Sequence, residues 1–214
     1  MTIEHHPEEA VLAAYAAGAV DLGQRVALAT HLYACPRCRT FVRAMERTGG
    51  VLLDDEKPAP MSADALGQTL ARLDEPQPRA PAPAPEIADA PPGLPGFVRR
   101  YAFGPWRFVA PRVRMRPIRL PEPTPTRVFL LRSAPGTALL EHDHTALEMT
   151  CVLTGAFRHD GGLYGPGDFD LGDDSVRHQP YVEEGEDCIS LVAMQGSLRW
   201  RGFWGKVAQP FVRL

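Results

Sequence analysis

The 214-residue chain lacks several features that would place it in common classes of protein. Its four cysteines are too few for the disulfide framework of a small secreted domain, and they fit a reducing compartment better. No apolar run approaches the roughly 20 residues needed to cross a bilayer, and the first residues are charged and polar, unlike a signal peptide. These absences predict a cytoplasmic protein that does not contact a membrane.

Basic charge is also scarce. The formal net charge is −3, with 7 basic and 11 acidic residues over positions 1–75, and 15 basic and 13 acidic over positions 97–214. Neither part carries the basic excess that neutralising phosphates requires. Direct nucleic-acid binding is therefore not expected, and a zinc regulator that binds DNA is disfavoured.

The sequence does contain a compact group of potential metal ligands, His31, Cys35 and Cys38, within eight residues. The segment before the cysteines reads as helix, so a histidine on its last turn and a Cys-x-x-Cys turn surround one point with three donors. Zn²⁺ prefers four such ligands in a tetrahedron, and His5 or His6 would supply the fourth. We therefore expect a Cys₂His₂ structural zinc site.

Two other interpretations of the cysteine pair are weaker. A thioredoxin-like redox motif should follow a strand in a βαβ unit, whereas this pair is embedded in helix-forming sequence. Two ordinary cysteines of one continuous helix are disfavoured by Pro36, which suits a turn or the first position of a new helix.

Four helices are expected in the first 75 residues. Capping residues, glycines and apolar spacing place them at 7–18, 21–33, 36–52 and 63–73. Such short helices make a small core, for which a structural metal is a usual remedy. The fourth helix has leucines at helical spacing, so it either closes this core or docks into a groove of a partner.

Residues 76–96 are rich in proline and alanine and are expected to form an extended, semi-rigid, solvated linker. Beyond them, short β-rich runs alternate with turn residues, which indicates a sandwich or barrel. The expected fold is multidomain, α plus all-β: a zinc-binding four-helix domain over 1–75, a linker over 76–96, and a β-barrel or jelly roll over 97–214.

A second group of potential ligands lies in the β-rich part. His142 and His144 alternate on one expected strand and so share a face, Glu148 has the same parity, and His178 follows later. Three imidazoles and a carboxylate suit Zn, Fe, Mn or Ni. The alternative, that His-x-His only decorates an exposed face, is weakened by the glutamate and by the block Gly165-Pro-Gly-Asp.

These motifs resemble known families. The block from Gly136 to Gly155 resembles the first cupin motif, and the block from Pro166 to His178 resembles the second, although its interval from Gly167 to His178 is longer than the common pattern. The N-terminal block resembles the zinc-binding anti-sigma domain, which implies the ligands His6, His31, Cys35 and Cys38. A zinc anti-sigma domain followed by a cupin is the arrangement of the ChrR family of anti-sigma factors.

This resemblance implies a transcriptional regulator whose helical domain binds an alternative (extracytoplasmic-function) sigma factor and keeps it from RNA polymerase. It also implies a cupin domain that responds to oxidative stress such as singlet oxygen. The expected cofactors are Zn²⁺ in the N-terminal site and Zn²⁺ or another divalent metal in the cupin site. The rival interpretation is a metal-dependent dioxygenase with an accessory zinc domain, but no substrate pocket or general base is identifiable in the sequence.

Overall fold

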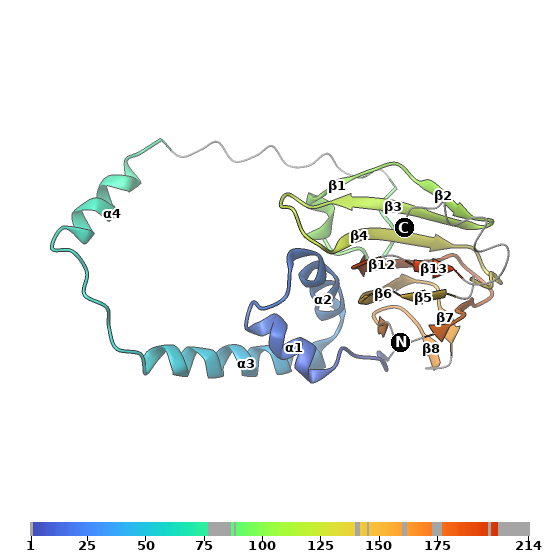
Figure 1. The fold of residues 1–214 in the computed structure, drawn as a ribbon, viewed down its shortest axis with the longest axis horizontal. Coiled ribbons are helices and arrows are strands. Elements are labelled where there is room, and N and C mark those ends of the chain that lie inside the picture. Colours follow the sequence, from blue (N-terminus) through green and yellow to red (C-terminus); the bar gives the residue numbers. More distant parts are fainter. Residues whose placement is uncertain are drawn as a thin grey trace.

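The computed structural model describes residues 2–76, 87, 89–139, 142–144, 146–159, 162–172, 177–196 and 198–200; at 142–144, 177–178 and 198–200 it describes the backbone alone. Four α-helices come first: α1 (Glu9–Ala16), α2 (Leu22–Ala34), α3 (Pro36–Asp54) and α4 (Ala65–Leu73). A 3₁₀ turn, Val98–Arg100, then leads into antiparallel strands, as Figure 1 shows. None of the helices in this part of the chain is long and apolar enough to cross a membrane.

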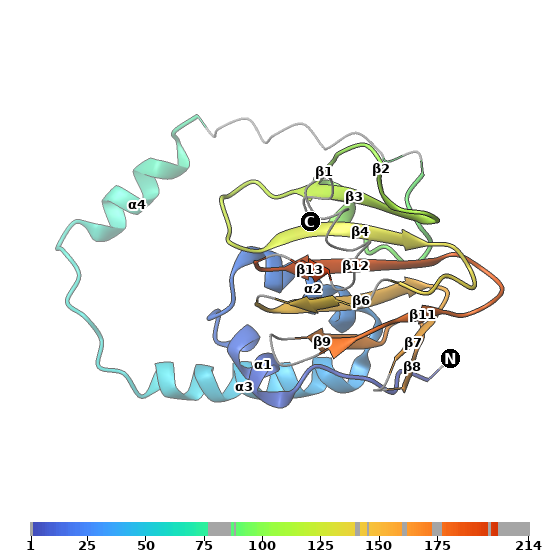
Figure 2. The same cartoon turned by 45° about the vertical axis from the view of Figure 1, so that its right-hand side comes forward.

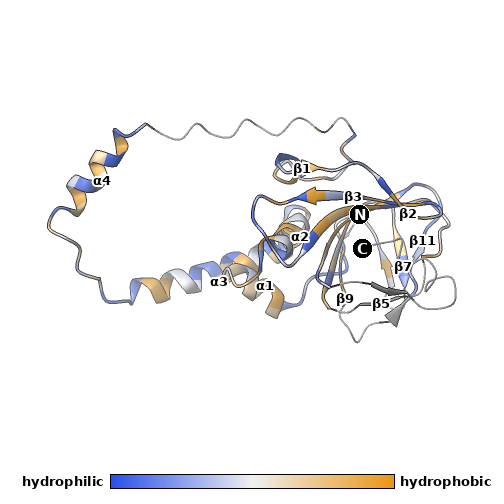
Figure 3. Ribbon diagram, turned by 45° about the horizontal axis from the view of Figure 1, so that its top comes forward, coloured by the Kyte–Doolittle hydropathy of each residue, from blue (hydrophilic) through white to orange (hydrophobic). Residues whose placement is uncertain are grey.

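The strands form a main sheet and two small ones. The main sheet has the order β1-β3-β4-β12-β6-β9, with β2 beside β3, and the small sheets have the orders β10-β5-β13 and β11-β7-β8. Figure 3 shows the strands curving around an interior, as the expected cupin-like architecture requires. The bounds are β1 (Ala102–Phe103), β2 (Arg107–Ala110), β3 (Val113–Arg119), β4 (Arg127–Ser133), β5 (His142–His144), β6 (Glu148–Thr154), β7 (Phe157–His159), β8 (Gly162–Tyr164), β9 (Phe169–Gly172), β10 (Arg177–His178), β11 (Tyr181–Val182), β12 (Cys188–Met194) and β13 (Leu198–Trp200).

The helix boundaries follow from local chemistry. Asp21 is the N-cap of α2, and its carboxylate accepts from the backbone N–H of Gly23 and of Gln24. The side-chain oxygen of Gln24 accepts from the backbone N–H of Asp21, which completes a capping box. α2 ends before Cys35, which caps α3, and Pro36 stands at the first position of α3. The expected break in the helix at Cys35-Pro36 is confirmed. Gly49 and Gly50 do not break α3, which continues to Asp54.

Helix α2 lies against the main sheet, behind β12 and β6 in Figure 2. Its residues Val26, Ala27 and Leu28 belong to the same hydrophobic cluster as Leu130 of β4 and Leu191 of β12. The opposite side of α2 packs in a second cluster with α1 and α3. α2 is therefore enclosed between two layers, and the helical and β parts share one continuous core.

The proline-rich tract is not solvated throughout, contrary to the sequence-based expectation. Leu94 is 4% exposed, and it joins the core cluster that contains α2 and the sheet. Asp89 accepts hydrogen bonds from Trp106 and Arg116, so the end of the tract is fastened to the β part. The end of the tract thus packs with the β part instead of spanning solvent as a linker.

Helix α4 stands apart from the other helices (Figure 1). Its leucines Leu66, Leu70 and Leu73 are 71%, 52% and 71% exposed. The interpretation that this helix closes the core of its own domain is therefore wrong. The core of the helical part is built from α1, α2 and α3 alone.

Candidate metal centres

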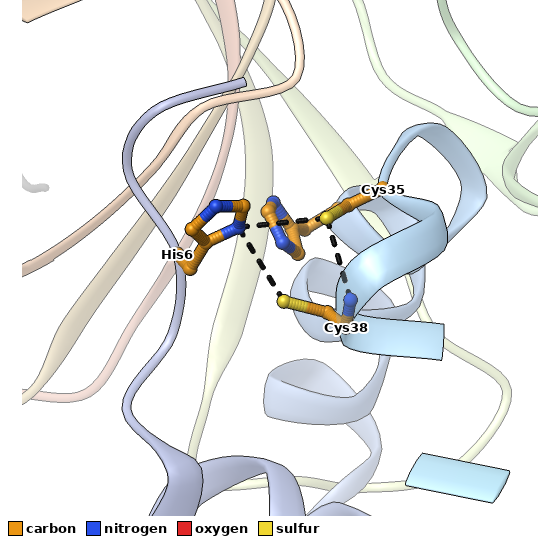
Figure 4. A group of neighbouring side chains, drawn as sticks. His6, Cys35 and Cys38 are labelled. Carbon is orange, nitrogen blue, oxygen red and sulfur yellow. Dashed lines mark hydrogen bonds between the residues drawn. The ribbon is translucent and has the colours of Figure 1, made fainter. Parts of the chain in front are cut away.

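The first candidate centre is the His/Cys group of the helical part. His31 lies on the last turn of α2, Cys35 caps α3, Cys38 lies on its first turn, and His6 comes from the extended segment before α1. One potential ligand atom from each of the four lies within 4.8 Å of all the others. Figure 4 shows the His6 ring facing the two sulfur atoms. The structure thus brings together the three residues that the spacing singled out and His6, which the resemblance implied.

The spacing within this group suits a tetrahedral metal. The Nδ1 atom of His6 is 3.5 Å from Sγ of Cys35 and 3.5 Å from Sγ of Cys38. With Zn–N bonds of about 2.0 Å and Zn–S bonds of about 2.3 Å, tetrahedral angles place nitrogen and sulfur about 3.5 Å apart. When bound, Zn²⁺ would stabilise the thiolates and tie α2, α3 and the N-terminal segment together.

The buried ring of His31 supplies an independent argument for a metal. Its Nε2 atom is buried and has no hydrogen-bond partner. Its Nδ1 atom lies 2.8 Å from the carbonyl oxygen of Gly167. Because a carbonyl only accepts, Nδ1 carries the proton and donates it, which leaves the Nε2 lone pair free. A buried Nε2 lone pair that no hydrogen bond satisfies, next to two thiols and a second imidazole, is the arrangement expected of a metal ligand.

The electrostatics agree with neutral imidazoles and metal-dependent thiolates. Burial lowers the pKa of His31 to about 4, partly opposed by its bond to Gly167. Burial, followed by the charge of Arg37, also lowers the pKa of His6. Burial raises the pKa of the Cys38 thiol to about 12, so without a cation this sulfur keeps its proton. A bound metal would reverse that preference.

The structure separates His6 from its neighbour His5. The N-terminal segment runs extended, and in extended backbone successive side chains point to opposite sides. His6 faces the cysteines, whereas the His5 ring stacks on Tyr164 of β8 with centroids 4.0 Å apart. His6 is therefore the fourth member of the group.

The second candidate centre is only partly described. His142 and His144 lie on β5 and His178 on β10, and the backbone pairing of β5 with β10 sets His178 opposite His142. The side chains of these three residues lie outside the described part of the structure. Their role as metal ligands together with Glu148 therefore stays a prediction.

Glu148 begins β6 and has an unusual environment. Burial, followed by the nearby charge of Asp170, raises the pKa of its carboxyl to about 7. The hydroxyl of Thr150 donates to it over 3.3 Å and opposes the shift. A partly desolvated carboxylate gains much from a cation, so this environment suits the ligand role.

Sequence reasoning missed several polar residues around both centres. Nε2 of His159 lies 3.2 Å from the Asp170 carboxylate, and its ring stacks on Tyr164. Asp168 and the Gly167 carbonyl contact the N-terminal group, although the sequence assigned this turn only to the cupin motif. The contacts of Asp168 and of the Gly167 carbonyl join residues more than 130 positions apart, so no local sequence pattern predicts them.

A helical His/Cys group followed by a cupin-like β part is the order that the resemblance to a zinc anti-sigma module with a cupin predicts. Residues 97–197 match the family model of the ChrR cupin-like domain. Anti-sigma-E factor ChrR of Cereibacter sphaeroides is 39% identical over 217 residues, covering 100% of both chains. The chain belongs to the ChrR family of anti-sigma factors.

A solved structure agrees with this assignment. The crystal structure of Rhodobacter sphaeroides SigE in complex with the anti-sigma ChrR matches with 34% sequence identity and a TM-score of 0.74. The match covers 91% of the present chain and 100% of the matched chain. The likeness therefore extends over the helical and the β parts.

Proposed function

We propose that this protein is an anti-sigma factor that binds an alternative (extracytoplasmic-function) sigma factor and sequesters it from RNA polymerase. The proposal rests on the family assignment, and above all on one structural observation: a run of large apolar side chains that are exposed within residues 51–73 of the described chain. Holding a partner requires no turnover, so the activity is that of a regulator and not of an enzyme.

The segment that carries these side chains, here called the distal arm, comprises the end of α3, the connecting segment and α4. Val51, Leu52 and Leu53 of α3 are 62%, 64% and 72% exposed, and Met61 is 84% exposed. With the three leucines of α4, they make seven exposed large apolar side chains within 23 residues. Exposed apolar residues gathered in this way mark interaction sites, whereas single ones are common on any surface. Apolar and polar residues alternate along α4 in Figure 3, as expected of a helix that lays one face into a groove.

The charge of the distal arm favours a basic partner. Acidic residues interrupt the apolar positions at Asp54, Asp55, Glu56, Asp64, Asp74 and Glu75. A partner that binds DNA carries basic surfaces that neutralise phosphates, so the acidic charge of the arm would steer its association and disfavour acidic competitors. The arm thus combines an apolar anchor with an acidic rim, which is the usual anatomy of a protein interface.

We further propose that the cupin part responds to oxidative stress such as singlet oxygen. The oxidisable side chains considered in the cupin part are the imidazoles of its candidate metal group and the thiols of its two cysteines. Burial raises the pKa of the Cys151 thiol, and it raises that of Cys188 to about 11, so both are protonated and poorly reactive. The histidines at 142, 144 and 178 are therefore the better candidates for the oxidised groups.

The sequestration proposal is tested by a paired substitution. Leu70→Asp places a charge in the distal arm, and Leu163→Asp places one on β8; both leucines are 52% exposed. Inhibition of transcription by purified polymerase and the cognate sigma factor should be lost with Leu70→Asp and retained with Leu163→Asp. Full inhibition by Leu70→Asp, or equal loss in both variants, would contradict the proposed surface.

A further inference from the structure

The turn between β8 and β9, residues 165–168, belongs to the β part but contacts the His/Cys group of the helical part. It reaches that group through two different residues. The carbonyl oxygen of Gly167 accepts from the His31 ring, and the carboxylate of Asp168 holds the segment that carries His6. Both histidines of the group are thus held by one turn.

Asp168 is 4% exposed and uses both carboxylate oxygens. Its Oδ1 atom accepts from the backbone N–H of Glu4 at 2.7 Å and of His5 at 2.9 Å. Its Oδ2 atom accepts from the backbone N–H of Gly165 at 2.8 Å, inside the turn itself. The carboxylate therefore joins the cupin turn to the two residues immediately before His6.

Gly167 is closely packed between the N-terminal segment and the end of α2. Its φ is +91°, and an added Cβ would lie 2.7 Å from Cδ1 of Ile3 and 3.3 Å from Cβ of Ala34. Ile3 belongs to the N-terminal segment and Ala34 to the end of α2. The close approach that only glycine permits here is what lets the Gly167 carbonyl reach His31.

We propose that the β8–β9 turn is the outer support of the N-terminal metal site, so that the β part sets the metal affinity of the helical part. Asp168 is a positioning residue: it fixes the backbone that presents His6. The Gly167 carbonyl fixes the tautomer and orientation of His31. Partners of this kind, which hold the ligands of a metal, usually strengthen its binding 10–100-fold.

The placement of the turn gives this support a regulatory consequence. β9 begins at Phe169, directly after Asp168, and pairs with β6, whose first residue is Glu148. A displacement of β9 carries Asp168 and Gly167 with it and so loosens the hold on His6 and His31. By linkage, metal in the N-terminal site must in turn stabilise the docked position of the turn.

Cobalt binding to the full chain tests the proposal. Cobalt(II) bound by thiolates gives charge-transfer absorption, and the cupin group contains no cysteine, so this signal reports the Cys35/Cys38 site alone. Asp168→Asn keeps the size of the side chain but turns one acceptor into a donor that faces an N–H. We expect the cobalt concentration for half-maximal absorption to rise about 10–100-fold. The matched control is Asp187→Asn, an ion-pairing carboxylate in the same β part, and it should behave like the wild type.

Asp168→Asn with wild-type cobalt affinity and an unchanged circular dichroism spectrum would overturn the proposal. If that variant does not fold, substitutions of Glu4 in the N-terminal segment test the same contact from its other side. Glu4→Pro removes one N–H donor and leaves Asp168 in place, whereas Glu4→Ala retains the donor. Weaker cobalt binding by Glu4→Pro alone supports the proposal, and equal binding by both variants overturns it. The assay contains no sigma factor, so its outcome is independent of the proposed function.

Discussion

Helices α2 and α4 both carry leucines at helical spacing, but their surroundings are opposite. α2 is enclosed between the main sheet and α1/α3, and its Leu28 is fully buried. α4 exposes Leu66 and Leu73, each to 71%, and joins neither hydrophobic cluster of the helical part. The apolar residues of α2 are buried in the fold, whereas those of α4 are exposed and available to the proposed partner.

The candidate metal group and the proposed partner surface lie at opposite ends of α3. The N-terminus of α3 supplies both cysteines, and its C-terminus carries the exposed residues of the distal arm. A single rigid helix therefore links the metal group to the proposed partner surface. Changes near α2 should act on stability and metal, and changes in the arm should act on the partner alone.

The largest expected effect comes from removing a metal ligand. Cys35→Ser retains the size of the side chain but weakens the thiolate pair, and metal binding by such sites contributes about 10–16 kcal/mol to folding. We expect loss of the N-terminal zinc, measured by metal analysis, together with loss of inhibition. Tyr33→Ala, a change to an exposed side chain two positions earlier, is the control. A Cys35→Ser protein that keeps a full equivalent of N-terminal zinc would rule out this site.

The contrast between the two helices is sharpened by matched leucine truncations. Leu28→Ala removes a fully buried side chain and should lower the free energy of unfolding by about 2–5 kcal/mol. Leu70→Ala removes a half-exposed one and should change it by less than about 0.5 kcal/mol. Affinity for the sigma factor should show the reverse order. Denaturant unfolding and a binding titration on both variants make the comparison, which fails if Leu70→Ala destabilises as much as Leu28→Ala.

Sequence patterns were sufficient for the parts of this molecule that are local. The helix–turn–helix around Cys35 follows from Pro36 and from capping at Asp21, and the main strands follow from β-rich runs between turn residues. The Cys-x-x-Cys spacing with a histidine one turn earlier was likewise enough to find three members of the metal group. Each of these features depends on residues within a few positions of one another.

The remaining features depend on contacts between distant segments. An amphipathic pattern does not distinguish a helix that packs on its own core from one that packs on a partner, so the exposure of α4 was not predictable. The burial of Leu94 in the tract expected to be a linker depends on the complete sheet. The support of His31 by Gly167 spans 136 positions and required the three-dimensional structure.

The pH dependence of the metal-free chain tests the enclosure of α2. Burial lowers the pKa of His31 to about 4 from 6.5, so the folded state excludes a proton that the unfolded state binds. Stability should therefore be full above pH 6.5 and fall by about 1.4 kcal/mol per unit as pH drops toward 4. Denaturant unfolding of chelator-treated protein measures this slope. His31→Asn, which does not titrate, should lose this component of the slope, and an unchanged slope would place the ring in a solvated environment.

The smallest expected effects come from two helical glycines, one of which packs against the β part while the other is open to solvent. Gly23 of α2 faces the β part, where an added Cβ would lie 2.6 Å from the backbone oxygen of Thr126, whereas Gly49 of α3 has nothing within 4 Å. Gly23→Ala should therefore destabilise by about 1–3 kcal/mol through overpacking. Gly49→Ala should stabilise by about 0.4–1 kcal/mol, because alanine loses less backbone entropy in a helix. Thermal unfolding should show a lower melting temperature for Gly23→Ala and a higher one for Gly49→Ala. A higher melting temperature for Gly23→Ala would mean that the contact between Gly23 and Thr126 is open in solution. The helical and β parts would then be held together by other contacts.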